Sequence, residues 1–283
     1  MVSLYKGPTK HTNYINTKYL IKCIGIGDLI FFCSAILAEH KENEPVEYFL
    51  SKDTLRIYRK NSGEYEIFCH EYIKYFLSNY DIKILNNINE TNRIWDTDFL
   101  RDGKILNNSS VIDTIKNKLI IKNKVYQDNY IVIFTKVRDL NLDVFSQVST
   151  NFFRSVNTFE GKVVLLGERQ VEYSGEYALH SKKNIYSIYQ NCKENIAQNK
   201  IIDLTIENFD FNTFSLSKIL EDCGIIMNSN KTYVFGGGGF FCLSLFTDKL
   251  VSLTNGIYRN AFYTKRNKNL FSSVDEFQKH LIQ

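Results

Sequence analysis

The sequence predicts an α/β protein made of two nucleotide-binding-type domains. Two observations carry this prediction: strand, turn, helix and strand signals alternate near the N-terminus, and the alternation starts again near residue 130. The polar stretch 122–129 lies between the two alternations. A chain of 283 residues is long enough for two domains that each bury a core. We therefore predict domains at 1–125 and 126–270, with a terminal helix at 271–283.

The first alternation begins with a turn rich in glycine. Residues 19–25 predict a buried strand, residues 29–40 a helix that is apolar nearly all round, and residues 46–50 the next strand. The segment after them predicts shorter elements, which are a helix at 73–77, a strand at 82–85, a loop at 107–110 and a strand at 119–121.

The second alternation is longer. It predicts strands at 130–135, 162–166, 201–204, 225–227 and 250–253, and helices at 142–155, 185–197, 213–222, 240–246 and 274–282. Gly224 lies just after the helix 213–222, where a glycine commonly ends a helix. That glycine is the reason for placing residues 225–227 in a strand.

Charge is mild and argues against nucleic acid as a partner. The net charge is +4, whereas nucleic-acid-binding domains usually carry a more basic, clustered face. Two basic stretches occur, and their members are Lys116, Lys118, Lys122 and Lys124 in the first and Arg259, Lys265, Arg266 and Lys268 in the second. Such runs are usually solvated surface. The alternative is a peripheral contact with anionic membrane lipid or with an acceptor.

The cysteine and histidine patterns predict neither zinc chemistry nor a hydrolase. None of the six cysteines forms a C-x-x-C pair, and several lie in apolar runs, as buried reduced thiols do. The five histidines are scattered, and no H-E-x-x-H or Ser-His-Asp order is visible. The longest apolar run, residues 29–38, is shorter than the about 20 residues of a membrane span. No signal peptide is recognisable at the N-terminus, so we expect a cytoplasmic protein.

The first candidate site is Gly25-Ile26-Gly27-Asp28, between the first predicted strand and helix. Gly25 and Gly27 allow a tight turn and the close approach of a ligand, and the N-terminus of the following helix offers free N–H groups. Asp28 lies at that helix end. A carboxylate at this position also serves as a helix cap with no ligand at all. The third glycine of the dinucleotide fingerprint is missing.

The second candidate is the run Gly236-Gly237-Gly238-Gly239, ahead of the predicted helix 240–246. Four consecutive glycines cost chain entropy, which is reasonable where backbone amides must reach a phosphate. The alternative is a flexible surface loop. No Lys-Ser/Thr pair follows, so the run is not a P-loop.

The third candidate lies at the carboxyl end of the strand 130–135, where ligands of open α/β sheets bind. Thr135, Lys136 and Arg138 supply a hydroxyl and two cations, which suit a diphosphate. The alternative is a solvated turn.

Charged residues also follow the strand 162–166. Glu168, Arg169 and Glu172 are placed to contact a ribose or a base. The alternative for these three is again solvated surface.

The order and spacing of these motifs resemble the heptosyltransferase-type glycosyltransferases (glycosyltransferase family 9-type) of bacterial surface-polysaccharide synthesis. Residues 24–30 are similar to the family's Gly-x-Gly-Asp segment that opens the first helix. Residues 163–168 look like the second strand of its C-terminal domain, and residues 225–254 have the spacing of its donor loop.

The resemblance implies a GT-B fold, in which two Rossmann-like domains face a cleft and the terminal helix crosses back to the N-terminal domain. It implies an inverting transfer from a nucleotide-diphosphate sugar to a glycan or lipid-linked acceptor, with no metal and no separate cofactor. Asp28 would be the general base. Thr135, Lys136 or Arg138 and the amides of the glycine run, including Gly237, Gly238 and Gly239, would hold the leaving diphosphate.

The sequence departs from the family in its donor loop. The family has Asp-Ser/Thr-Gly followed by a histidine three residues after the glycine, whereas this chain has Gly237-Gly238-Gly239 and then Cys242. Its phosphate-binding lysine also lies farther past the strand than Lys136 does here. Two other interpretations therefore stay open, a non-catalytic nucleotide- or glycan-binding protein on the same fold and an NAD-type oxidoreductase.

Overall fold

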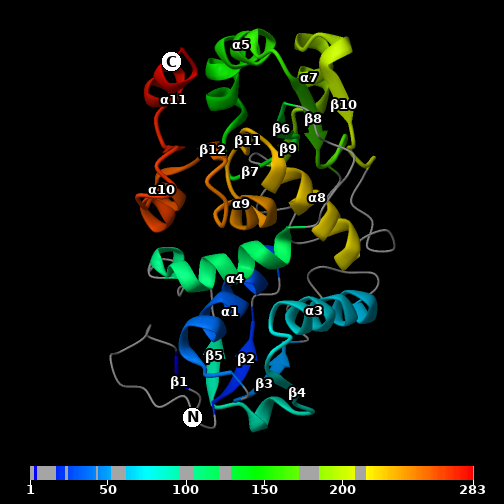
Figure 1. Cartoon of the computed structure of the whole chain (residues 1–283), viewed down its shortest axis with the longest axis vertical. Helices are drawn as coiled ribbons and strands as arrows, with labels where there is room; N and C mark the ends of the chain where they lie inside the picture. The colour runs from blue at the N-terminus through cyan, green and yellow to red at the C-terminus, as the bar shows by residue number, and fades with distance from the viewer. Residues whose placement is uncertain are drawn as a thin grey trace. The chain divides into compact units, whose positions relative to one another are not determined.

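The computed structural model describes residues 3–4, 17–22, 25–42, 44–51, 62–95, 105–120, 129–171, 185–207 and 215–282 (Figure 1). The chain forms two compact units, Met1–Lys118 and Leu119–Gln283. Each unit contains a parallel sheet with helices, which confirms the predicted α/β class. The boundary predicted between residues 125 and 126 falls outside the described residues.

The sheet of unit 1 has five parallel strands in the order β1-β5-β2-β3-β4. These strands are β1 (Ser3–Leu4), β2 (Lys18–Ile21), β3 (Pro45–Leu50), β4 (Asp81–Ile84) and β5 (Arg93–Trp95). The helices of this unit are α1 (Ile26–Glu39), α3 (Ser62–Phe76) and α4 (Ser109–Leu119), with short 3-10 turns η1 (Ile88–Glu90) and η3 (Ile105–Asn107).

One face of this sheet is packed with aromatic side chains. Phe32 of α1 lies edge-on to Tyr19 and to Trp95, with ring centroids 5.4 Å apart in each pair. Phe32 also meets Tyr48 of β3 at 6.1 Å. Because α1 is buried along most of its length, its nearly continuous apolar sequence is explained by packing rather than by a single apolar stripe.

The opposite face carries charge. Lys18, Glu47 and Lys83 are cross-strand neighbours on β2, β3 and β4. Glu47 forms ion pairs with Lys83 at 2.5 Å and with Lys18 at 3.5 Å. Paired residues of neighbouring strands point to the same side, so this ladder lies on the face away from Tyr19 and Tyr48.

The main sheet of unit 2 has six parallel strands in the order β10-β8-β6-β11-β12-β13. They are β6 (Tyr130–Phe134), β8 (Lys162–Leu166), β10 (Ile201–Asp203), β11 (Thr232–Tyr233), β12 (Leu250–Leu253) and β13 (Leu270–Phe271). A separate antiparallel pair is formed by β7 (Lys136–Arg138) and β9 (Ile185–Ser187). The helical elements are α5 (Leu142–Thr158), α7 (Tyr189–Asn195), η4 (Gln198–Lys200), α8 (Leu216–Asn228), α9 (Gly239–Ser244), α10 (Gly256–Phe262) and α11 (Val274–Ile282).

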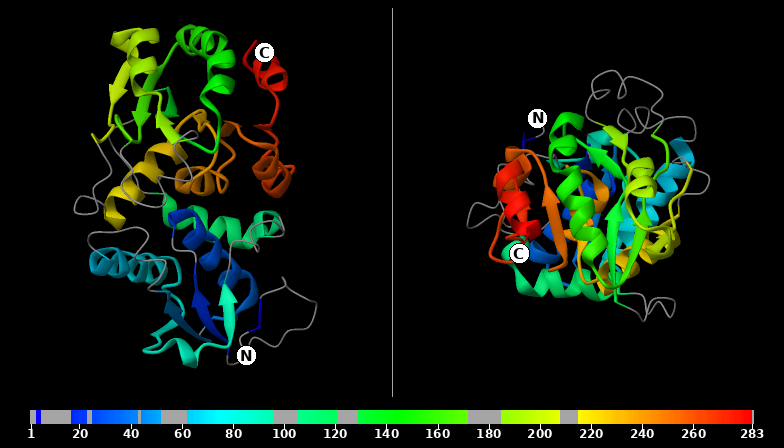
Figure 2. Two further views of the ribbon diagram at one scale, coloured as in Figure 1. Left: turned by 180° about the vertical axis from the view of Figure 1, so that it is seen from behind. Right: turned by 90° about the horizontal axis from the view of Figure 1, so that it is seen from above.

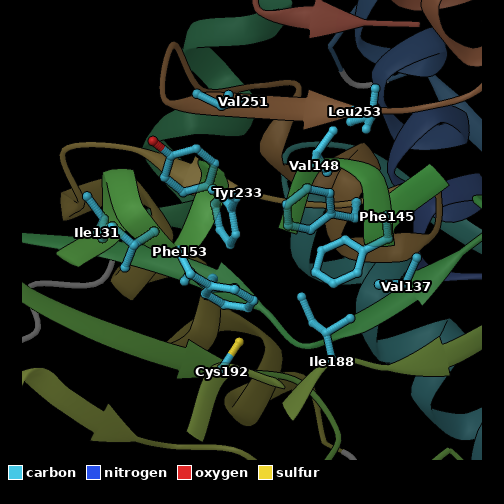
Figure 3. Close-up of a cluster of buried hydrophobic side chains, with 14 of the residues drawn as sticks. Ile131, Val137, Phe145, Val148, Phe153, Ile188, Cys192, Tyr233, Val251 and Leu253 are labelled. Carbon is cyan, nitrogen blue, oxygen red and sulfur yellow. The ribbon is translucent and has the colours of Figure 1, made fainter. Parts of the chain in front are cut away.

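Both faces of this sheet are covered by helices. On one face, Phe145 and Phe153 of α5 lie in one buried cluster with Ile131, Tyr233 and Val251 of the strands (Figure 3). Helix α11 packs beside α5 and contributes Phe277 to the same core (Figure 2). On the other face, Tyr130 donates a hydrogen bond to the carbonyl of Ile225 in α8 at 2.7 Å. Burial on both sides explains the nearly uninterrupted apolar sequence of β6 and β8.

The prediction of a strand at 225–227 is wrong. Helix α8 runs without a break from Leu216 to Asn228, and Gly224 lies buried inside it. The β-branched residues that suggest a strand are buried in the helix instead, because packing against the sheet overrides local propensity. The strand that follows is β11, Thr232–Tyr233.

Two shorter predictions are also corrected. Leu119 ends helix α4, so it does not begin a strand; residue 121 lies outside the described residues. Residues 185–187 form β9 and pair with β7, and helix α7 begins only at Tyr189. Helix α11 packs mainly against α5 and β13 of unit 2. The crossing of this helix to the N-terminal domain stays a prediction of the family resemblance.

Candidate functional site

The strand order of unit 2 contains a topological switch point between β6 and β11. From β6 the chain proceeds outward through β8 and β10 on one side, and then through β11, β12 and β13 on the other. In open α/β sheets of this kind, ligands bind beyond the carboxyl ends of the strands where the order reverses. The residues that follow β6 and β11 are therefore the strongest candidates for a ligand-binding site in unit 2.

The structure brings two predicted candidates together at this point. Arg138, just after β6, forms a parallel bridge with Gly236, just after β11. The amide of Gly237 donates a hydrogen bond of 2.7 Å to the carbonyl of Arg138. The segment 135–138 and the glycine run, which are far apart in the sequence, thus form one structure.

The first three glycines of the run are each needed for a different reason. A Cβ on Gly236 would lie 1.7 Å from the carbonyl oxygen of Arg138, and φ of this glycine is +79°. A Cβ on Gly237 would lie 2.6 Å from the ring of Tyr258. Gly238 has space around it, but its φ of +116° is a conformation that only glycine adopts readily.

Hydrogen bonds within the protein already engage the first part of the run. The amide of Gly236 donates to the carbonyl of Leu253 at 2.8 Å, and the amide of Gly237 is held by Arg138. Gly238 and Gly239 follow and are only half-buried. Of the predicted phosphate ligands in this run, these last two are the better placed.

Thr135 has a structural role in the described contacts. Its side chain is fully buried, and its Oγ1 lies 3.0 Å from the carbonyl of Leu166 and 2.8 Å from that of Glu168. A Cβ on Gly167, whose φ is +102°, would approach that same hydroxyl to 2.9 Å. The hydroxyl thus ties the end of β6 to the end of β8.

Lys136 and Glu168 form an ion pair. Lys136 Nζ lies 2.7 Å from Glu168 Oε1. The Glu168 residue is 7% exposed, and its carbonyl also accepts a hydrogen bond from the Ser187 hydroxyl at 2.7 Å. Because the carboxylate is paired and largely desolvated, Lys136 and Glu168 act as one unit rather than as two independent ligands.

A second cluster surrounds Arg138 and was not predicted from the sequence. Asp139 has a φ of +61°, and its Oδ2 accepts a hydrogen bond of 2.9 Å from the Tyr258 hydroxyl. The Nε of Arg138 lies 3.4 Å from the same oxygen. Burial raises the pKa of Tyr258, so its phenol stays protonated and donates. Asn255 caps α10 by accepting from the amide of Tyr258 at 3.0 Å.

Only part of this cluster has a signal in the sequence. The pair Asn255-Gly256 before an apolar segment is a helix-start signal that predicts α10. The left-handed conformation of Asp139 and its contact with Tyr258 depend on chain segments that are distant in sequence, so no local pattern predicts them.

Arg169 belongs to a separate polar group at the ends of β8 and β10. Its guanidinium lies over the ring of Tyr189 at 5.3 Å and 3.4 Å from both Asp203 and Glu207. Burial alone would raise the pKa of Asp203, but hydrogen bonds from Thr205 and Tyr189 hold that pKa below its ordinary value. The other residue predicted here, Glu172, lies outside the described residues.

In unit 1, Asp28 lies in the first turn of α1, at a second switch point. Strand β2 lies between β3 and β5 in the sheet, and α1 follows β2 in the chain. The Oδ2 of Asp28 accepts a hydrogen bond from the amide of Gly25 at 3.1 Å. Gly27 is buried in the same turn. The capping role considered for Asp28 is therefore present, and it holds the carboxylate at the helix N-terminus.

No metal centre or membrane span is visible in the part of the chain that the structure describes. In these ranges, no three His, Cys, Asp or Glu side chains come together as metal ligands. No described helix is both long and apolar enough to cross a membrane. The described cysteines, which are Cys33, Cys69, Cys192, Cys223 and Cys242, are buried and form no disulfide bonds with one another.

Together these features define a two-unit α/β protein with a parallel sheet and a switch point in each unit. No protein-family model matches the chain, and no curated protein matches it. Among solved structures, it is similar to the dodecameric iron-containing heptosyltransferase TibC in complex with ADP-D-beta-D-heptose, with a TM-score of 0.41 and 13% sequence identity. The match covers 89% of this chain and 62% of that one, so the chain spans less than two thirds of its length. A likeness of this size does not identify the function of this chain. The function must be inferred from the chain's own residues.

Proposed function

We propose that this protein is a glycosyltransferase that moves a sugar from a nucleotide-diphosphate donor to a surface-polysaccharide or lipid-linked glycan acceptor. The observation that carries the proposal is the junction of Arg138 with the glycine run at the switch point of unit 2. A cation and close backbone at the carboxyl end of a parallel sheet suit a diphosphate.

The donor would bind to unit 2. Arg138 would neutralise the leaving diphosphate, assisted by the amides of Gly238 and Gly239. The Lys136–Glu168 pair lies at the ends of β6 and β8, where its carboxylate could accept from a ribose hydroxyl. Thr135 would act indirectly by holding these strand ends in register.

The chemistry favours a diphosphate sugar over a dinucleotide cofactor. A dinucleotide fold carries its glycine-rich turn directly after its first strand. In unit 2 that strand is β6, and the residues after it, 135–140, contain no glycine. The glycines follow β11 instead. In unit 2 a pyrophosphate would therefore be held by the cations after β6 together with the glycine run after β11.

The acceptor would bind to unit 1, with Asp28 as the general base. Its carboxylate would take the proton from the acceptor hydroxyl as that oxygen attacks the anomeric carbon. The new glycosidic bond forms on the side opposite to the departing nucleoside diphosphate, so the configuration inverts. The proposal requires the GT-B arrangement, with both switch points bordering one cleft and no metal in the reaction.

One observation favours a second candidate, a non-catalytic nucleotide- or glycan-binding protein. Cys242 occupies the position where the resembled family has a histidine, and it is 7% exposed within α9. A buried thiol there cannot replace an imidazole that contacts a donor. Binding with no turnover would select this candidate.

Nucleotide binding can be tested by thermal shift with ADP, UDP, GDP, CDP, CMP and NAD. A ligand at roughly 100 times its Kd adds about 2.7 kcal/mol to the free energy of unfolding. We expect one nucleoside diphosphate to raise the Tm and Arg138→Ala to remove the shift, whereas Arg154→Ala on the exposed side of α5 keeps it. A shift with NAD alone, or an equal shift in both variants, contradicts the proposed site.

The base is tested by two substitutions that separate capping from catalysis. Asp28→Asn keeps an oxygen that accepts from the Gly25 amide but removes the basic carboxylate, whereas Asp28→Ala removes both. We expect both variants to lose sugar transfer by about 100-fold or more while nucleotide binding persists. Only Asp28→Ala should also lose about 1 kcal/mol of stability. Full transfer activity in Asp28→Asn would exclude Asp28 as the base.

A further inference from the structure

The chain segment that contains helix α10 is basic. Between Lys249 and Val274 the chain contains five cations and no Asp or Glu, and these cations are Lys249, Arg259, Lys265, Arg266 and Lys268. Two acidic residues from other segments contact α10: Glu276 on α11 lies 3.5 Å from Arg259, and Asp139 accepts a hydrogen bond from Tyr258 at 2.9 Å. The lysines 265 and 268 are exposed.

Large apolar side chains project from the same segment. Ile257 is 70% exposed, the highest value among the large hydrophobic residues that the structure describes, and Tyr263 is 50% exposed. Ile257 and Asn260 are exposed positions three residues apart on α10, so they lie on neighbouring parts of its surface. Tyr263 follows directly after the last helical residue, in an extended conformation. Exposing these two side chains to water is unfavourable unless something covers them.

The opposite side of α10 is anchored firmly to unit 2. Phe262 is buried and contacts Phe241 with ring centroids 5.9 Å apart. Arg259 donates to the carbonyl of Leu270 at 3.1 Å, and Arg266 donates to that of Phe246 at 3.1 Å. Arg259 also lies over the ring of Tyr263 at 5.4 Å. These contacts hold the exposed side chains on a rigid support.

We propose that the segment 256–268, the α10 surface, docks on an anionic lipid bilayer. Ile257 would enter the interfacial region, and Tyr263 would lie at the level of the headgroups, where tyrosine is enriched. Lys265 and Lys268 would pair with lipid phosphates. The mixture of lysines with one aliphatic and one aromatic side chain favours lipid over a protein partner, because lysine is depleted in protein interfaces. This function goes beyond sugar transfer and does not depend on it.

The test is co-sedimentation of the full chain with vesicles of phosphatidylcholine alone or mixed with phosphatidylglycerol, without nucleotide or acceptor. We expect binding to the anionic vesicles only, and weaker binding as salt is added. The double variant Lys265→Ala/Lys268→Ala should lower the partition coefficient about 30-fold. Ile257→Ser should lower it about tenfold.

A matched control has the same change in net charge elsewhere. Lys41 and Lys74 are exposed lysines of unit 1, and Lys41→Ala/Lys74→Ala should bind vesicles like the unmodified chain. Equal binding to neutral vesicles, equal losses in both double variants, or no binding at all would overturn the proposal. So would binding of a single-stranded oligonucleotide at this surface in place of vesicles. None of these outcomes bears on the transfer reaction, which is measured separately.

Discussion

The two sheets bury their residues in different ways. In unit 2, every residue of β6 and β12 is buried, and helices cover both faces. In unit 1, the residues of β3 after the exposed Pro45 alternate between buried and half-buried positions, and β4 is mostly exposed. One sheet therefore has an apolar sequence on both sides, while the other has a charged ladder on one of its faces.

The same contrast holds for the contacts that position the candidate sites. In unit 2, the candidate site is positioned mainly by the backbone, since Gly236 and Gly238 have positive φ and Gly236 packs against the Arg138 carbonyl. In unit 1, a side chain positions the candidate site, because Asp28 holds the start of α1. We infer that the geometry of the candidate site in unit 2 tolerates less variation in sequence than that in unit 1 does.

The largest expected effect comes from adding one methyl group to the glycine run. Gly236→Ala would place a Cβ 1.7 Å from a carbonyl oxygen at a φ of +79°, so β7 and the loop must separate. We expect unit 2 to lose about 3–5 kcal/mol of stability, because steric overlap and backbone strain add. Far-UV circular dichroism during urea unfolding should show an earlier transition.

Two other glycines and the single tryptophan provide the controls. Gly238→Ala has space around it, so only the positive φ is strained and the loss should be about 1–2 kcal/mol. Gly63→Ala, in open space on α3 of unit 1, should gain about 0.5–1 kcal/mol. Trp95 is buried in unit 1, so its fluorescence should report an unchanged transition in Gly236→Ala. Equal losses at positions 236 and 238 would mean that the Arg138 contact is not what holds the loop.

Local patterns predicted the elements that combine strong apolar character with clear ends. The strands at 130–134 and 162–166 and the helices at 26–39 and 142–158 are such cases. The strand predicted at 225–227 is wrong because Gly224 does not end the helix: burial against the sheet extends α8 past this glycine to Asn228.

The residues of the candidate site could be predicted from the sequence, but the contacts between them could not. The sequence shows polar residues and glycines directly after predicted strands, namely Lys136, Arg138, Glu168 and the glycine run. Their pairing depends on which strands are neighbours, and that order is set by contacts between residues distant in sequence. The partnership of Asp139 with Tyr258 has the same origin, which is why it was missed.

A smaller effect should separate the two units on mild acidification. In unit 1, Tyr19 bonds to His40 at 2.9 Å and Tyr48 bonds to His70 at 2.8 Å. Burial lowers the pKa of both histidines from 6.5, with Arg93 and Lys74 acting in the same direction and Glu44 and Glu66 opposing it. Below about pH 6.5 the unfolded chain therefore binds protons that folded unit 1 does not, and unit 1 loses stability as the pH falls.

In unit 2, the pKa values of two buried groups are shifted in opposite directions. Burial lowers the pKa of His280, but it raises that of Asp222 from 3.8 to about 6 in spite of Lys218. Folded unit 2 therefore takes up a proton at Asp222 as the pH falls below about 6, which offsets the loss at His280.

We therefore expect the free energy of unfolding to decrease more in unit 1 than in unit 2 between about pH 7 and about pH 5. Unfolding in urea can be monitored by the fluorescence of Trp95 for unit 1 and by amide hydrogen exchange for unit 2. His70→Gln keeps a hydrogen-bonding partner for Tyr48 without a titrating group, so it should reduce the pH dependence of unit 1. An equally steep decrease in both units, or an unchanged slope in His70→Gln, would show that these buried histidines do not distinguish the two units. The expected result would tie the acid sensitivity of unit 1 to its Tyr19–His40 and Tyr48–His70 pairs.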